Sequence, residues 1–321
     1  MPNGATDDLD TPRIVVDETS FDFRSLTLEQ LEDNLDLFNE ALGELLHSEH
    51  TVATSPFCVE YECRDATTLS EFLFSPNPDV GRDTRLRCGI LLERCPDWDE
   101  WVKDACTTVS LDGEPARDAY TIGFALTMTT RGRAAACLMF PNGRSAGWSP
   151  VHGDVGQESV FFFADAARLP WFWRGLFASE AKDEHAFFSL AREAFPELCL
   201  HPDLTFRRFD GGYVILRDHL VRVLAALNDH FGHALAEHQG IPHNVQAAMG
   251  QHGVDLSPES PNTRTSERLM RLRDVDFEGA TYRCEWHAKL ERHRNRVHFT
   301  LPAMGPSGRI LVGLFIDHLD T

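Results

Sequence analysis

Hydrophobic and polar residues alternate near the end of the chain, in the stretch CEWHAKLERHRNRVHF at residues 284–299. On either side of the polar ERHRN segment, apolar or small side chains occupy every second position, and mainly ionisable side chains occupy the positions between them. Successive side chains of a strand point to opposite faces of a sheet. The pattern therefore predicts a hairpin with one buried face and one polar face.

Helical spacing marks other parts of the chain. A capping-box pattern at Thr27–Gln30 precedes a leucine stripe that ends before Ser48, and a second long stripe runs from Ile215 to His238. Strands are expected in YTIGFALTM, RAAACLMF, SVFFFAD and the apolar run GRILVGLFID. The predicted fold class is α+β: an N-terminal mixed helix and strand region, followed by helices packed on a C-terminal three-stranded antiparallel sheet.

The same patterns divide the chain of 321 residues into three regions. Residues 1–20 are polar and acidic and are expected to form a mobile tail. Residues 21–200 are expected to form the N-terminal α+β region, and residues 201–321 the C-terminal helix plus antiparallel-sheet domain. The N-terminus lacks a basic, apolar leader, and no apolar run reaches the roughly 18 residues of a membrane span, so a cytoplasmic location is expected.

Charge is unevenly distributed along the chain. The formal net charge is −20, but residues 262–309 hold ten Arg and Lys against six Asp and Glu, a net of +4, which leaves −24 for the remainder. A phosphate ligand should therefore meet the C-terminal part of the protein. The eight cysteines are scattered without a CxxC pair, which favours buried thiols over a disulfide framework or a zinc site.

The polar face of the hairpin is the leading candidate site. Cleaving RNA without a metal needs a base for the 2′-hydroxyl, cations for the phosphorane charge and an acid for the leaving oxygen. The candidate catalytic residues are Glu285, His287, Lys289, Arg296 and His298. The histidines would exchange protons, the two cations would hold the phosphate, and Glu285 would orient an imidazole. The alternative interpretation is a solvated sheet face stabilised by cross-strand charge pairs.

Two further groups of residues carry hypotheses of their own. A stiff SPESPNTR loop and a short basic helix suggest nucleic-acid contacts through Arg264, Arg268, Arg271, Arg292 and Arg294. His230, His233 and Glu237 share one helical face and could present two imidazoles and a carboxylate to zinc or iron. A solvated helix end is the alternative there. The leading hypothesis needs no cofactor and no metal.

The segments SPESPNTR, CEWHAKL, NRVHF and GRILVGLFIDHL together resemble an outlying form of the RelE/ParE-like toxin superfamily. The resemblance covers the C-terminal part only. It implies helices packed on an antiparallel sheet, and for some members a ribosome-dependent RNase activity. By this resemblance Lys289, Arg296 and His298 would hold phosphate and exchange protons.

The first functional hypothesis is therefore a bacterial toxin-type or phage-defence effector that acts on nucleic acid as a metal-independent RNase. A non-catalytic binding or scaffold component of such a system is the first alternative, and a metal-dependent hydrolase is the second. The partners considered are RNA or the ribosome, bound through the C-terminal basic segment, and a protein partner. No membrane partner is expected. Catalysis requires the polar groups of the hairpin to converge on an open concavity, whereas a binding module tolerates them dispersed or covered.

Overall fold

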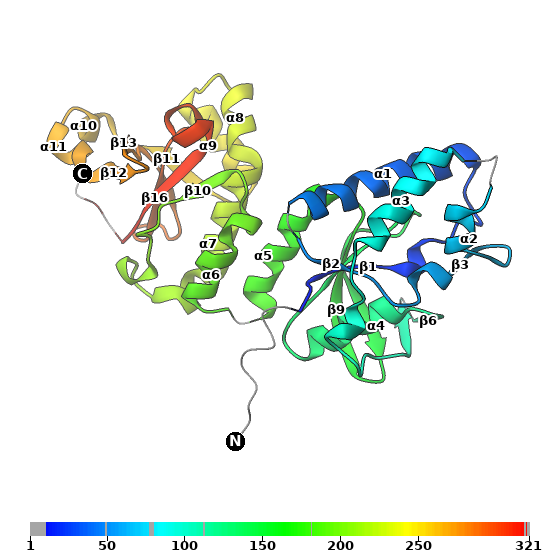
Figure 1. The fold of residues 1–321 in the computed structure, drawn as a ribbon. Helices are drawn as coiled ribbons and strands as arrows, with labels where there is room; N and C mark the ends of the chain where they lie inside the picture. Colours follow the sequence, from blue (N-terminus) through cyan, green and yellow to red (C-terminus); the bar gives the residue numbers. More distant parts are fainter. Residues whose placement is uncertain are drawn as a thin grey trace. The chain divides into compact units, whose positions relative to one another are not determined.

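The computed structural model describes residues 11–48, 50–76, 80–111, 113–180, 182–317 and 319. The chain divides into two compact units, one ending at Phe172 and one beginning at Trp173 (Figure 1). The division falls inside helix α5 (Leu169–Ser179) and not at residue 200, where the sequence analysis placed it. The reason is strand β10 (Leu198–Leu200), which pairs in parallel with the C-terminal strand β16 (Ile310–Ile316) and so belongs to the second unit.

The N-terminal segment does not form a tail throughout. Residues 1–10 lie outside the described part, but β1 (Ile14–Val16) is an inner strand of the first sheet, with partners on both sides. Three consecutive β-branched residues suit a parallel strand that is buried on both faces, and all three are buried. The expectation of a mobile segment up to residue 20 was wrong because the acidic composition hid this short apolar run.

The first unit is built on a mixed sheet of seven strands in the order β2-β1-β7-β9-β8-β5-β6. The four neighbouring strands β2, β1, β7 and β9 run parallel to one another, and the remaining pairs in the sheet are antiparallel. The strand bounds are β2 Val52–Ala53, β5 Val109–Leu111, β6 Glu114–Ala116, β7 Ala136–Leu138, β8 Gly147–Gly153 and β9 Gly156–Phe163. A separate small hairpin pairs β3 (Glu62–Arg64) with β4 (Thr67–Thr68).

Helices cover both faces of this sheet (Figure 1). They are α1 (Leu28–His47), α2 (Leu69–Phe74), α3 (Arg82–Glu93) and α4 (Tyr120–Thr130). The prediction of α1 is confirmed, including the capping box of Thr27 and Gln30. The prediction of a strand at YTIGFALTM was wrong, because this segment forms α4. It is buried on nearly every side, and a uniformly apolar run carries no period that separates helix from strand.

The second unit contains a sheet of five strands, not three, in the order β10-β16-β15-β14-β11. The expected hairpin is present as β14 (Trp286–Lys289) and β15 (Arg296–Phe299), and β16 is buried in the sheet. The added edge strands are β10 and β11 (Asp255–Pro258). Both are short, and β11 ends in proline, so neither gives a clear strand signal. The predicted α+β character is confirmed, although the strand count is not.

One face of the second sheet packs on helices. The helices before β11 are α5, α6 (Glu184–Ala194), α7 (Gly212–Ala226), α8 (Gly232–Glu237) and α9 (Pro242–Gln251). A π-helical turn, Leu227–Phe231, joins α7 to α8 inside the predicted long helix. The ring of Phe231 packs edge-on against Trp286 and Phe299, with ring centroids 5.5 and 5.2 Å away. The apolar face of the hairpin therefore packs against the helices, and the alternation correctly predicted that one face is buried.

The opposite face is covered by the segment between β11 and β14. It comprises α10 (Pro261–Arg264), α11 (Glu267–Met270), a 3-10 turn at Arg271–Arg273, β12 (Asp274–Phe277) and β13 (Ala280–Arg283). Figure 1 shows these elements on the side of β16 away from α7. A side chain at Gly313 would collide with Cys284 Sγ at 2.4 Å, so this glycine allows the cover to lie directly on the sheet. We call residues 259–284 the covering segment.

Candidate functional site

The two central strands bring the predicted polar residues into register. His287 lies opposite His298, and Lys289 lies opposite Arg296, so the expected pairing onto one side of the hairpin is confirmed. Directly opposed side chains on one face of an antiparallel pair lie close together. The imidazole ring centroids of the two histidines are 5.2 Å apart.

This polar face is buried. His287 is 8% exposed and His298 is 1% exposed, because Glu259 and Arg273 of the covering segment lie against them. The expectation of an open, wet face was wrong. Alternation within the strands shows which residues share a face, but not that a distant segment lies over it.

Glu259 Oε1 is the centre of the resulting cluster. It lies 2.9 Å from Arg273 Nε, 3.4 Å from His287 Nδ1 and 3.8 Å from His298 Nδ1. Arg273 Nη1 also donates to the backbone oxygen of Leu269 at 2.7 Å. On the far side of the ring, His287 Nε2 lies 3.3 Å from the hydroxyl oxygen of Ser257. The cluster thus joins a charged pair and two imidazoles inside the unit.

Burial and neighbouring charges set the protonation of these groups. Burial alone would raise the pKa of Glu259, but the adjacent His287 and Arg273 side chains and their positive charge lower it to about 2. Burial, reinforced by the charge of His287, lowers the pKa of His298 to about 3. Glu259 is therefore ionised and His298 neutral at physiological pH. A neutral imidazole can accept a proton or ligate a metal, but it is not a general acid.

The other three catalytic candidates do not join the histidines. Glu285 forms an ion pair with Arg264 at 2.7 Å, and Lys289 forms one with Asp255 at 2.9 Å. Arg296 is partly buried, and its Nε has no hydrogen-bond partner among the described residues. The five polar groups proposed for RNA cleavage are therefore dispersed: the histidines lie in a buried cluster, Glu285 and Lys289 lie in separate ion pairs, and Arg296 belongs to neither.

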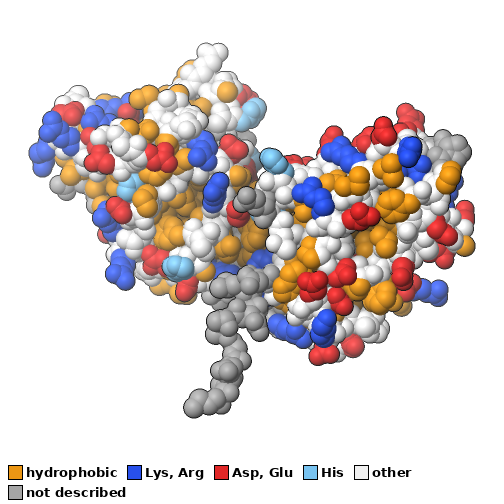
Figure 2. Space-filling model, in the orientation of Figure 1, with side chains coloured by type: hydrophobic (Ala, Val, Ile, Leu, Met, Phe, Trp, Pro, Cys, Tyr) orange, Lys and Arg blue, Asp and Glu red, His pale blue; other side chains and the backbone are white. Residues whose placement is uncertain are grey.

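The arginines proposed for nucleic-acid contact are all exposed, in two groups. One group lies at α10 and α11, and the other lies in the turn between β14 and β15, at the opposite end of the hairpin. Several are in ion pairs: Arg264 with Glu285, Arg271 with Glu267, and Arg294 with Asp210 and Glu291. Arg268 and Arg292 make no ion pair with any described residue. Figure 2 shows Lys and Arg side chains gathered over the α10–α11 end.

The helix histidines line an open hollow of about 460 Å³ that also includes His238 and His252. His230 stacks on His252, with ring centroids 3.8 Å apart, while His233 Nε2 lies 3.5 Å from Glu237. Within the described part of the chain, the one group whose ligating atoms all lie within 4.8 Å of one another is Glu259, His287 and His298. The structure therefore does not gather His230, His233 and Glu237 into a metal centre.

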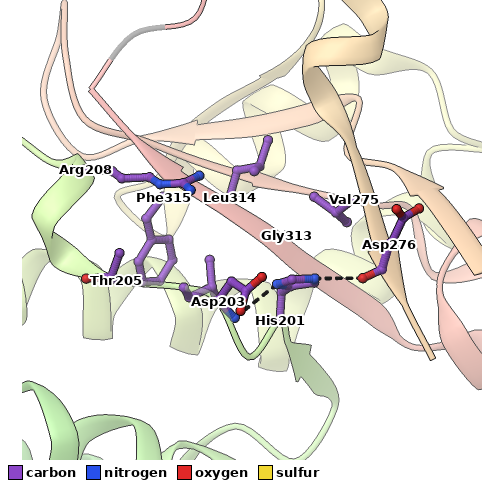
Figure 3. Close-up of a pocket in the computed structure, with 10 residues that line it drawn as sticks. His201, Asp203, Thr205, Arg208, Val275, Asp276, Gly313, Leu314 and Phe315 are labelled. Atoms are coloured by element: carbon purple, nitrogen blue, oxygen red, sulfur yellow. Dashed lines mark hydrogen bonds between the residues drawn. The ribbon is translucent and has the colours of Figure 1, made fainter. Parts of the chain in front are cut away.

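A second hollow, of about 260 Å³, lies between the end of β10 and the β12 strand (Figure 3). The backbone N–H of Asp203 donates to His201 Nδ1 at 3.1 Å, so His201 Nε2 carries the proton and donates to the Asp276 carbonyl at 2.9 Å. Thr205 and Arg208 also line the space. Both ring nitrogens of His201 are satisfied, which makes this histidine a structural link between β10 and the covering segment.

Sequence reasoning also missed a buried acid in the first unit. Glu18 follows β1 at the carboxyl edge of the parallel strands, and its Oε1 accepts a hydrogen bond from the Thr121 N–H at 2.8 Å. Burial, together with the charge of Asp17, raises the pKa of Glu18 to about 8. Asp17 itself forms an ion pair with Arg144. No motif signals this arrangement, because it depends on the loops after β1 and β7 meeting beside the start of α4.

Comparison with known proteins adds no assignment. No family model, no curated protein and no solved structure matches the chain. The resemblance to RelE/ParE-like toxins therefore stays a prediction. Within the described ranges, every helix is too short or too polar to traverse a lipid bilayer.

Proposed function

We propose that this protein is a nucleic-acid-directed binding component of a toxin-type or phage-defence system, and not a metal-independent RNase. The observation that carries the proposal is the burial of both histidines, at 8% and 1% exposure, beneath the covering segment. A catalytic base must come within hydrogen-bond reach of the proton that it removes, whereas His287 Nδ1 and both ring nitrogens of His298 are buried.

Protonation supports the same choice. Proton transfer in metal-free RNA cleavage needs two groups whose pKa values lie near the working pH. The pKa of His298 is lowered to about 3, primarily by burial, so this imidazole is a weak base and carries no proton to donate. Lys289, the proposed phosphate ligand, is engaged by Asp255 at the other end of the strand. A binding role makes none of these demands.

The surface proposed for nucleic acid consists of Arg264, Arg268 and Arg271 on the covering segment, which we call the α10–α11 surface. All three side chains are exposed, and Arg268 has no ion-pair partner among the described residues. The surface pairs of Arg264 and Arg271 with glutamates are worth only about 0–1 kcal/mol each. Phosphate can therefore replace those carboxylates with little loss. The acidic remainder of the chain would restrict binding to this surface.

The test is binding of fluorescently labelled single-stranded RNA and duplex DNA, followed by anisotropy at several salt concentrations. The triple variant R264Q/R268Q/R271Q removes the proposed contacts. Each lost phosphate contact reduces the slope of log affinity against log salt by about 0.7–0.9, so the variant should lose about 2–3 in slope as well as affinity.

The matched control is R82Q/R87Q/R94Q, which removes the same number of charges from exposed positions on and beside α3 of the first unit. This control keeps the salt slope of the wild type under the proposal. Equal losses in both variants would mean that net charge, and not the α10–α11 surface, sets binding. No binding by the wild type to either nucleic acid would contradict the proposed function.

A further inference from the structure

The buried cluster brings together three side chains that ligate metals well. Glu259 follows β11, His287 lies on β14 and His298 lies on β15, so three separate segments supply one potential ligand each. Their ligating atoms all lie within 4.8 Å of one another. We propose that Glu259, His287 and His298 form a binding site for one divalent transition-metal ion of the zinc class.

The distances suit such an ion. Zinc binds imidazole nitrogen and carboxylate oxygen at about 2.0–2.2 Å, so two ligand atoms on a tetrahedral ion are separated by about 3.4 Å. Glu259 Oε1 lies 3.4 Å from His287 Nδ1 and 3.8 Å from His298 Nδ1. The two carboxylate–imidazole distances thus need to change by at most a few tenths of an ångström, while the two imidazole nitrogens lie within 4.8 Å of each other and would move closer around the ion. Two imidazoles and one carboxylate also suit iron(II) and cobalt(II).

Unused hydrogen-bonding capacity supports the site. His287 Nδ1 and both ring nitrogens of His298 are buried and have no hydrogen-bond partner in the described part of the chain. Leaving a buried polar atom without a partner is unfavourable, and a metal ion would satisfy two of these three atoms. Without an ion, these imidazole nitrogens are removed from water and no hydrogen bond replaces the ones that water would make.

The neighbours of the ligands fit supporting roles. If His287 binds the ion through Nδ1, its Nε2 carries a proton and can donate it to the Ser257 hydroxyl 3.3 Å away. Metal-bound histidines usually donate their second N–H to an oxygen in this way. Arg273 Nε, at 2.9 Å from Glu259 Oε1, holds the carboxylate towards the two rings. Its positive charge adds to that of the metal, so a hydroxide or another anion is expected as the fourth ligand.

The site would act on the covering segment. Glu259 begins this segment, and the two histidines belong to the strands beneath it. An ion bound by all three would join the cover to the sheet and hold the α10–α11 surface in place. Metal binding would then stabilise the second unit by mass action, by an amount that grows with the logarithm of the ratio of ion concentration to dissociation constant.

The experiment measures metal in the full chain, purified without a polyhistidine tag, incubated with zinc and then desalted. Elemental analysis should give about one zinc per chain for the wild type. His298→Leu, which fills a similar buried volume, should lower occupancy about tenfold or more. His233→Leu is the matched control, because it removes an exposed histidine from the other histidine-rich hollow and should leave occupancy unchanged.

Cobalt(II) titration of the unaltered protein provides a second readout that needs no variant. The proposal expects visible absorption bands of a four- or five-coordinate cobalt site with imidazole ligands, and displacement of those bands by zinc. Neither zinc retention nor cobalt absorption in the wild type would overturn the proposal. It would equally be overturned if His298→Leu, shown to be folded by circular dichroism, kept its zinc while His233→Leu lost it.

Discussion

The buried ion pair between Arg273 and Glu259 makes a sharp prediction, because an exposed counterpart lies in the same 3-10 turn. Arg273 and Glu259 side chains are 1% and 4% exposed and meet at 2.9 Å. Arg271 and Glu267 side chains are 74% and 62% exposed and meet at 3.5 Å. Replacing either arginine by methionine removes one charge from nearly the same place in the chain, but from opposite environments.

The expected magnitudes differ widely. Removing one partner of a buried pair leaves an uncompensated charge and costs about 3–5 kcal/mol. An exposed pair on one helical turn contributes only about 0.3–0.5 kcal/mol. Arg273→Met should therefore lower the free energy of opening of the second unit by about 3–5 kcal/mol. Adding Glu259→Gln should recover part of this loss, because it removes the stranded carboxylate.

The assay is native-state hydrogen exchange measured on peptides from β14 and β15, in the presence of a chelator so that the ion pair alone is tested. Exchange reports the stability of the second unit separately, which a single global unfolding curve of a two-unit chain does not. Equal protection in Arg273→Met and Arg271→Met would refute the reasoning. So would a double variant, Arg273→Met with Glu259→Gln, that loses as much as the sum of its two single changes.

Two further predictions concern Glu18 and two helical glycines, Gly123 in the first unit and Gly232 in the second. Because burial raises the pKa of Glu18 from 4.5 to about 8, the folded state holds a proton that the unfolded state releases, and stability should fall as pH rises through this window. Glu18→Gln removes that dependence. In thermal melts, the free energy of unfolding of the variant relative to the wild type should therefore rise between pH 5 and 8, by on the order of 4 kcal/mol. A difference that stays constant with pH would contradict the raised pKa. Gly123→Ala places a Cβ 1.8 Å from the Cys106 carbonyl oxygen and should destabilise α4 by about 1–3 kcal/mol or more. Gly232→Ala, with nothing within 4 Å, should be neutral or stabilising in the same urea titration.

How far the sequence predicted the fold depended on how local each signal was. Helix α1 was found because its capping box and leucine stripe are contained in its own residues. Alternation in two neighbouring strands indicated that His287 and His298 share one face, and the structure adds the register that places them opposite each other. Helix α4 was missed because a segment buried on all sides has no polar stripe to reveal its period.

The site itself was only partly predictable. The two histidines were identified because they alternate with apolar residues and so lie on the polar face of the hairpin. Their partners Glu259 and Arg273 lie in a segment that was interpreted as a loop and a basic helix. Their approach depends on the β12–β13 hairpin packing against β16, where Gly313 and Cys284 meet. Such a contact between distant parts of the chain leaves no periodic signal. A single sequence therefore identified the ionisable face without showing that it is closed.

The central claim is that the second unit binds nucleic acid without cleaving it. The most direct measurement is the length of a labelled single-stranded RNA after incubation with the purified full chain, at a protein concentration where anisotropy shows the RNA to be bound. The account predicts bound RNA of unchanged length. Shortened products that disappear when His298 is replaced by leucine would contradict it and restore the histidines to a catalytic role.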